Sequence, residues 1–239
     1  MYHVLDIPSS LSRPWVYANF VMTLDGKVAI TSSRENYWPL GSTHDYNAMM
    51  HLRAQADVLV HGRKTAQVFR ALTRLEDGRF QAQRKEMGKP EFLPYVILSK
   101  VGGDDCVPFL TSSSGVPTYL ATLDGAIISP SVKAVSSIIR SGETSLDVAS
   151  FVEWCRGQGY QRILLEGGPT SFYSFLKAGY IDDLFLTIAP KLVGGGLGQA
   201  QTLLDGDLFS LKEVKRPHLV SCQRVEDELF LHYRFTSLL

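Results

Sequence analysis

The chain has 239 residues with 24 basic and 24 acidic side chains, a balance that gives no sign of a nucleic-acid or anionic-membrane surface. Its apolar residues fall in short runs, none near the length of about 18 residues that a membrane helix needs. Cys106, Cys155 and Cys222 are far apart and odd in number, and no secretory signal opens the chain. We therefore expect a cytoplasmic protein without a metal centre that binds neither nucleic acid nor membrane.

Short apolar runs alternate with segments of helical periodicity along the first half of the chain. Residues 1–13 read as an extended leader that lies on the surface or on a partner subunit. Residues 73–93 are too polar and charged to interpret. We predict strands over 15–23, 57–60, 95–98, 116–121 and 132–139, and helices beginning near residue 43 and running from 63 through 69.

The second half continues this alternation and ends differently. Thr144 and Asp147 match a capping box for a helix that ends at a glycine. A strand over 162–165, a helix from Pro169, an alternating strand over 184–189 and a closing hairpin that turns near Asp227 follow. This pattern predicts one α/β domain over 1–239, with a largely parallel sheet, flanking helices and an antiparallel edge.

Residues 162–179, RILLEGGPTSFYSFLKAG, combine a buried strand, a bare glycine turn and an amphipathic helix. Pro169 suits the first helical position. Gly167 and Gly168 would lie at the helix N-terminus, where unpaired amides favour an anion and glycine lets a phosphate approach closely. A turn that needs glycine for its geometry alone explains the motif equally well, so the other motifs have to separate the two interpretations.

A second turn repeats this design. Gly62, Arg63, Lys64 and Thr65 follow a strand and open a helix with two cations and a hydroxyl, although a solvated first turn is the alternative. Ser99-Lys100 follows the next strand, at the sheet edge where α/β proteins bind ligands. Three such places suit a ligand with several phosphates, such as a dinucleotide. The chain has neither a Walker loop nor a GxGxxG fingerprint, which disfavours P-loop enzymes and ordinary Rossmann dehydrogenases.

The segments LEGGPTSFYSFLKAGYIDDLFLTIAPKLVGGG, RPWVYANFVMTLDGKVA and LRAQADVLVHGRKT together resemble the reductase domain of riboflavin biosynthesis, the C-terminal half of the bifunctional deaminase-reductase. The resemblance spans about residues 13–236. It implies a dihydrofolate-reductase-like fold, NADPH as cofactor and a homodimer. The zinc signature of the deaminase half, HxE followed by PCxxC, does not occur in the sequence, so we expect that half to be absent.

The resemblance also implies roles for individual residues. The substrate contacts would be Asn19, Arg53 and Glu166. Arg53 would anchor the substrate 5′-phosphate, and Glu166 would act catalytically by stabilising the protonated imine whose C1′ accepts the hydride. Cofactor contacts would come from Met22, Trp38, Gly62, Arg63, Lys64, Thr65, Ser99, Lys100, Gly167, Gly168, Pro169, Thr170, Ser171 and Phe172.

One segment departs from the family. After Thr65 the chain reads AQVFRALTRLED, where the family usually has an Ala-Asp-Asp-Pro stretch that leads to substrate contacts. Asn19 occupies a position where the bifunctional bacterial enzymes have lysine, and an amide could recognise an amino-pyrimidine as readily as a uracil. The sequence therefore does not decide which pyrimidine ring the substrate carries. The alternatives are a reductase of another pterin- or flavin-related substrate and a cofactor-binding protein without turnover.

Overall fold

A computed structural model of the chain describes residues 5, 7, 12–29, 39–69, 75, 77–111, 115–195 and 200–235. Within these residues, nine strands form one large sheet in the order β10-β11-β8-β1-β7-β3-β4-β5-β6. The strands from β8 to β6 in this order are parallel, whereas β11 runs antiparallel to both β8 and β10. Their bounds are β1 Trp15–Thr23, β3 Val58–Gly62, β4 Tyr95–Leu98, β5 Thr118–Thr122, β6 Ser137–Arg140, β7 Arg162–Leu165, β8 Asp183–Ala189, β10 His218–Val225 and β11 Glu228–Arg234.

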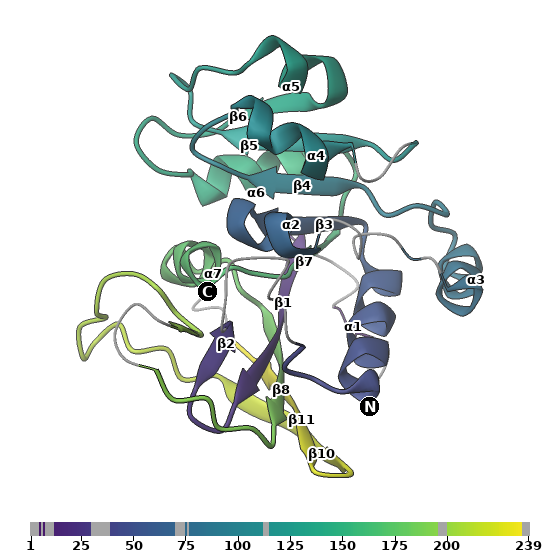
Figure 1. Ribbon diagram of the computed structural model, residues 1–239, viewed down its shortest axis with the longest axis vertical. Helices are drawn as coiled ribbons and strands as arrows, with labels where there is room; N and C mark the ends of the chain where they lie inside the picture. The colour runs from purple at the N-terminus through teal and green to yellow at the C-terminus, as the bar shows by residue number, and fades with distance from the viewer. Residues whose placement is uncertain are drawn as a thin grey trace.

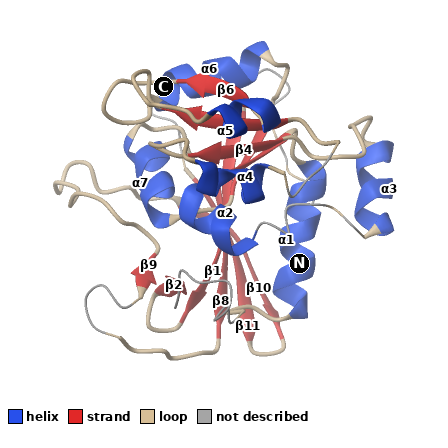
Figure 2. Ribbon diagram, turned by 45° about the horizontal axis from the view of Figure 1, so that its top comes forward, coloured by secondary structure: helices blue, strands red, loops and turns tan. Residues whose placement is uncertain are grey.

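Two short strands stand apart from the large sheet. β2 (Lys27–Ala29) pairs antiparallel with β9 (Gln201–Thr202), and Figure 2 shows β2 next to β1 with β9 on its outer side. The turn between β1 and β2 contains Asp25, which accepts hydrogen bonds from the Thr23 hydroxyl and from the backbone of Gly194. Asp25 is thus a turn residue, as the Asp-Gly pair predicts.

Helices cover both faces of the sheet. One core cluster packs under α1, α3, α4 and α5, and a second packs under α6 and α7. Figure 1 shows α3 beside α1, at the outer side of the molecule. The bounds are α1 Thr43–Gln55, α2 Arg63–Phe69, α3 Gly78–Glu86, α4 Val107–Leu110, α5 Pro130–Val135, α6 Val148–Gly157 and α7 Pro169–Lys177, with a 3₁₀ turn, η1, at Asp104–Cys106.

The predicted alternation of strands and helices is confirmed, including the closing hairpin, but two details are wrong. The strand expected over 132–139 begins instead as helix α5, because Ser129 caps its N-terminus and Pro130 occupies the first helical position. The helix expected to begin at a Thr144 capping box begins at Val148, because Asp147 accepts the amide of Ser150.

The predicted leader contributes to the core. Leu5 is only 6% exposed and its amide donates to Oε1 of Gln55, on helix α1, at 2.7 Å. This residue therefore does not lie on the surface, although most of the leader lies outside the described residues. A single domain over 1–239 stays a prediction.

Candidate active site

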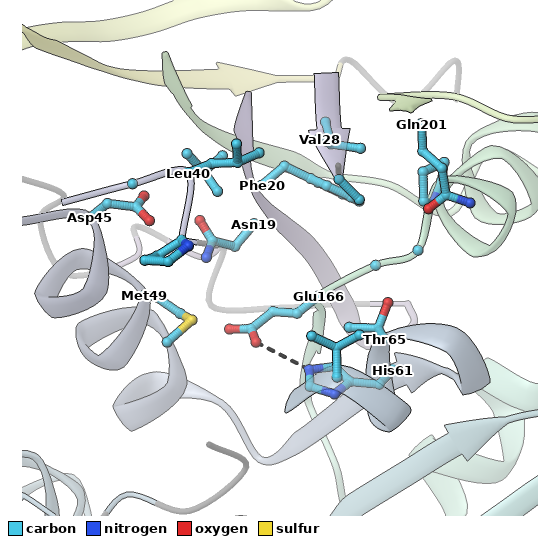
Figure 3. Close-up of a pocket in the computed structure, with 18 of the residues that line it drawn as sticks. Asn19, Phe20, Val28, Leu40, Asp45, Met49, His61, Thr65, Glu166 and Gln201 are labelled. Atoms are coloured by element: carbon cyan, nitrogen blue, oxygen red, sulfur yellow. Dashed lines mark hydrogen bonds and ion pairs between the residues drawn. The ribbon is translucent and has the colours of Figure 1, made fainter. Parts of the chain in front are cut away.

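A cavity of about 210 Å³ lies between helix α1 and the strands β1, β3 and β7. Helix α1 contributes Asp45, Met49 and Arg53, which are spaced four residues apart and so share one face of the helix. Figure 3 shows Asp45 and Glu166 on opposite sides of this space, with Asn19 of β1 between them. Helix α1 therefore covers a mainly apolar cavity at the middle of the sheet, into which a few polar side chains are placed.

Strand alternation brings the polar side chains to the face under α1. Tyr17 of β1 and Leu164 of β7 pack in the core cluster on that face, and side chains two residues further along point the same way. Asn19 and Glu166 occupy those positions, and His61 of β3 also lines the cavity. Asn19 and His61 lie on β1 and β3, and Glu166 directly follows β7 between them, which explains why segments far apart in the sequence meet here.

Glu166 is held by two basic side chains. Arg53 donates from Nε to both carboxylate oxygens at 3.0 Å and from Nη2 to Oε2 at 2.5 Å. Nε2 of His61 lies 3.2 Å from Oε2, and its Nδ1 lies 3.1 Å from the hydroxyl of Tyr95. All four side chains are buried. The network fixes the orientation of Glu166 through a fork of hydrogen bonds that only arginine can make.

This network also sets the charge of Glu166. Burial alone would raise its pKa, but Arg53 and His61 together lower the pKa to about 2. Burial lowers the pKa of His61 below its ordinary value, although Glu166 opposes this effect. Glu166 is therefore a carboxylate at neutral pH, and His61 favours the neutral imidazole. A carboxylate in this state can stabilise a cation but cannot donate a proton.

The glycine turn after β7 forms the floor of the cavity on the α7 side. Gly167, Gly168 and Pro169 line it, and Pro169 is the first residue of α7. Gly167 has φ +82°, a conformation that favours glycine, and no side chain caps the helix. The first amides of α7 have no partner within the helix, so this helix end offers hydrogen-bond donors beside the glycine turn.

Gly62 packs tightly against this turn. Its amide donates to the carbonyl of Gly167 at 2.7 Å. A Cβ at residue 62 would lie 2.9 Å from the hydroxyl of Ser171 and 3.1 Å from the backbone nitrogen of Gly168. Glycine at residue 62 therefore allows the two turns to pack closely, whereas a side chain there would displace the Ser171 hydroxyl and push against the backbone of Gly168.

The five residues that are predicted to bind phosphate after β3 and β4 separate into two groups. Lys64 and Thr65 line the cavity. Arg63 instead pairs with Asp105 at the surface, and Ser99 donates to the carbonyl of Val101 at 2.6 Å. Lys100 is exposed, directly after Ser99 at the same edge of the sheet. The structure thus brings Lys64 and Thr65 to the cavity, while the other three residues stay outside its wall.

Four further predicted residues do not line the cavity. Met22 and Phe172 pack in the core cluster under α6 and α7, and the Phe172 ring lies 5.0 Å from that of Phe20. Thr170 donates to Asp205 at 2.9 Å, and Ser171 faces Gly62. Phe172 is thus a core residue, because it lies on the apolar face of α7. Trp38 falls outside the described residues.

The structure changes the interpretation of Arg53. The sequence suggested an anchor for the substrate phosphate, but the Arg53 side chain is 1% exposed and two of its nitrogens donate to Glu166. This geometry favours a residue that positions Glu166. The roles of all these residues in binding or catalysis stay predictions.

His61 and Asp45 are among the cavity residues that sequence reasoning missed. His61 is a polar residue at the end of a buried apolar strand, VLVHG, which is a signal that a reader of the sequence could use. Asp45 lies eight residues before Arg53 and hence on the same face of the predicted helix. Neither signal identifies a cavity residue until the packing of helix α1 on the strands is known.

In the part of the chain that the structure describes, no cluster of three metal-binding side chains occurs, and no helix is long and apolar enough to cross a membrane.

Comparison with known proteins gives consistent matches. The chain matches the model of the RibD C-terminal domain over residues 14–230. It is 25% identical over 224 residues to the 2,5-diamino-6-ribosylamino-4(3H)-pyrimidinone 5′-phosphate reductase of Methanothermobacter thermautotrophicus, covering 92% of this chain and 98% of that protein. It is 26% identical over 211 residues to the riboflavin biosynthesis protein RibD of Bacillus amyloliquefaciens, covering 86% of this chain and 53% of that protein.

A solved structure confirms the fold. The pyrimidine reductase-like protein of Corynebacterium diphtheriae matches with a TM-score of 0.75 at 20% identity, over 93% of this chain and 92% of that one. Its likeness, together with the mixed, mostly parallel sheet, confirms the predicted dihydrofolate-reductase-like fold.

Proposed function

The chain belongs to the RibD C-terminal domain family, and from this premise we propose that it is an NADPH-dependent reductase of riboflavin biosynthesis. It reduces the ribosyl C1′ of an amino-pyrimidine ribosylamino 5′-phosphate to give the ribityl product. The archaeal relative named as such a reductase is matched over nearly its whole length, whereas RibD proteins are matched over about half. The proposal accordingly covers the reductase activity alone.

The residues of the glycine turns suit a dinucleotide cofactor. Gly167 adopts a positive φ, and a Cβ at Gly168 would meet only the Thr65 hydroxyl, at 3.5 Å, so the backbone of this turn is open to close approach. The uncapped N-terminus of α7 offers amides to an anion. We expect Gly167, Gly168 and Thr65 to hold the pyrophosphate, with Lys64 and Lys100 near the 2′-phosphate.

When bound, the nicotinamide supplies the hydride that reduces C1′. The chain itself has to place the two reactants together and to stabilise the charge that the substrate develops. Protonation of the imine nitrogen makes C1′ more electrophilic, and Glu166, an anion with a pKa of about 2, favours that cation. Arg53 and His61 keep Glu166 ionised and oriented.

The observation that carries the proposal is the buried carboxylate of Glu166 beside the glycine turn, in the cavity under α1. We expect this arrangement to place an anion that faces the substrate next to a turn that binds phosphate, within the three consecutive residues from Glu166 to Gly168. The proposal also includes a homodimer located in the cytoplasm. Sedimentation of the purified chain tests whether it forms a homodimer.

The activity is tested by following NADPH absorbance with the diaminopyrimidinone ribosylamino 5′-phosphate and with its deaminated uracil counterpart. Oxidation of NADPH with formation of the ribityl product supports the proposal. Tight NADPH binding without turnover of either compound would identify a cofactor-binding protein instead. Turnover restricted to a pterin would assign a different substrate, an outcome that the altered segment after Thr65 keeps open.

A further inference from the structure

The cavity has a second end, away from the glycine turn, where Asp45 lines the wall and Thr187 and Glu228 lie close to its carboxylate. Asp45 lies in the first turn of α1, and Thr187 lies on β8, opposite Val21 of β1. Glu228 begins β11, whose Phe230 pairs with Thr187. A second carboxylate, that of Glu228, and the hydroxyl of Thr187 therefore lie close to Asp45 at this end of the cavity.

The two carboxylates at this end have different partners. Glu228 accepts from the Ser42 amide at 2.9 Å and from the Ser42 hydroxyl at 2.5 Å, so it serves the start of α1. Asp45 accepts from the buried Thr187 hydroxyl and lines the cavity. A side chain at Gly41 would overlap the Asp45 carboxylate, which shows how closely the chain packs around it. Asp45 is thus the carboxyl group at this end that faces the cavity.

The surroundings of Asp45 are unfavourable for an anion. Burial is the largest effect and raises its pKa to about 6, and the carboxylates of Glu228 and Glu166 raise the pKa further. The Thr187 hydroxyl and Lys191 act in the opposite direction, but the ammonium of Lys191 also donates to the carbonyls of Pro39 and Leu40. A substrate phosphate would be repelled here, whereas a group that donates hydrogen bonds would be stabilised.

Resting on the proposed function, we propose that Asp45 binds the 2-amino group and the adjacent ring N–H of a diaminopyrimidinone, and thereby selects this substrate over its deaminated uracil counterpart. The amino-pyrimidinone presents two neighbouring donors on that edge, and a carboxylate accepts both, as it does from an arginine fork. In the uracil, a carbonyl oxygen replaces the amino group and would face the carboxylate. A site that hydrogen-bonds a substrate N–H rejects the analogue that lacks it strongly.

The arrangement along α1 fits such a substrate. Eight residues separate Asp45 from Arg53, which corresponds to about 12 Å along the helix axis. Met49 and Asn19 line the cavity between the two ends. The ring would lie between Met49 and Asn19, with its donor edge on Asp45, and the ribosyl group would extend toward Glu166. The base thus occupies the acidic end, and the phosphate lies away from it.

The test compares kcat/KM for the two pyrimidine substrates in the wild-type chain, in Asp45→Asn and in Asp124→Asn. Asp124 lies exposed beyond β5, remote from the cavity, and provides the same charge change as a control. We expect the wild type and the control to prefer the diamino substrate, and Asp45→Asn to reduce that preference about tenfold or more, because an amide both donates and accepts.

The wild type provides a second test that needs no variant. Ionised Asp45 accepts two donors, whereas protonated Asp45 can donate to the uracil carbonyl. The preference for the diamino substrate should therefore rise about tenfold between about pH 5 and about pH 8. A preference that is independent of pH, or unchanged in Asp45→Asn, overturns the inference while the reductase activity stands. Absence of turnover with either substrate in the folded wild type overturns the proposed function and the inference with it.

Discussion

Arg53, in the last turn of α1, donates from Nε and Nη2 to the carboxylate of Glu166, which follows β7 and lies 113 residues later in the chain. Both side chains are buried, so breaking this ion pair should cost more stability than breaking an ion pair at the surface. Removing one partner leaves the other charge without compensation in a nonpolar environment.

Arg53→Met should therefore lower the free energy of unfolding by about 3–5 kcal/mol, measured by urea denaturation. Arg79→Met provides a matched control, because Arg79 forms an exposed ion pair with Asp77 on α3. We expect no measurable loss in the control. Equal losses in the two variants would show that the buried pair does not stabilise the fold.

The sequence allows the fold to be predicted well because its signals are local. Pro169 at the start of α7 and the alternating apolar residues of β8 depend only on neighbouring residues, and the structure confirms both. The region 132–139 was misread because Ser129 and Pro130, which start helix α5, precede the apolar residues that suggested a strand.

The site was harder to predict because its contacts are not local. Nothing in the sequence indicates that Arg53 meets Glu166 rather than a ligand, since that contact depends on α1 crossing β7. The same holds for Asp45, which becomes a cavity residue only when α1 lies over β8. Motifs identify residues at strand ends, but the packing of a helix on the sheet decides which of them face each other.

Glu166→Gln should reduce kcat by about tenfold to a hundredfold while leaving NADPH affinity nearly intact. The glutamine keeps the shape of the side chain and removes the charge that would stabilise the protonated imine. Steady-state kinetics on the diaminopyrimidinone substrate separates the two parameters, since loss of a transition-state interaction appears in kcat. A change confined to KM would assign Glu166 to substrate binding instead.

Gly168→Val should weaken NADPH binding at least about tenfold without unfolding the chain. Gly168 has φ −82° and its Cβ would meet only Thr65, so the fold accommodates a side chain there that would obstruct the amides of α7. Gly125→Val, in an open turn, is the control. Cofactor affinity is measured by fluorescence titration, with thermal melting as the check on folding. Unchanged affinity in a folded Gly168→Val variant would make the turn purely structural.

NADPH should bind more tightly than NADH, and Lys64→Ala and Lys100→Ala should each reduce that preference about tenfold. Both lysines are exposed near the carboxyl ends of β3 and β4. Arg63→Ala should have a smaller effect, because Arg63 already pairs with Asp105. Lys133→Ala, on α5, is the control. Equal affinities of the wild type for the two cofactors would refute the role of these lysines.

Asp45→Asn should stabilise the fold at about pH 8 but not at about pH 4, with a difference of at most about 3 kcal/mol in the free energy of unfolding. Burial raises the folded-state pKa of Asp45 from 3.8 to about 6, so the folded chain binds a proton that the unfolded chain releases. Its contribution is present below about pH 4 and is lost as the pH rises through about 6.

Urea denaturation of wild type and Asp45→Asn at the two pH values measures this difference, with Asp124→Asn as the control for a change of net charge. Glu166 has the opposite sign, since its lowered pKa contributes stability above about pH 4.5 that is lost on acidification. Asp45 would thus lower the stability of the folded chain at neutral pH although it lines the cavity. Such a cost in stability is typical of residues that are kept for ligand binding. Equal stability of the two chains at about pH 8 would mean that Asp45 is solvated, and the cavity would then lack the desolvated acceptor that selection of an amino-pyrimidine needs.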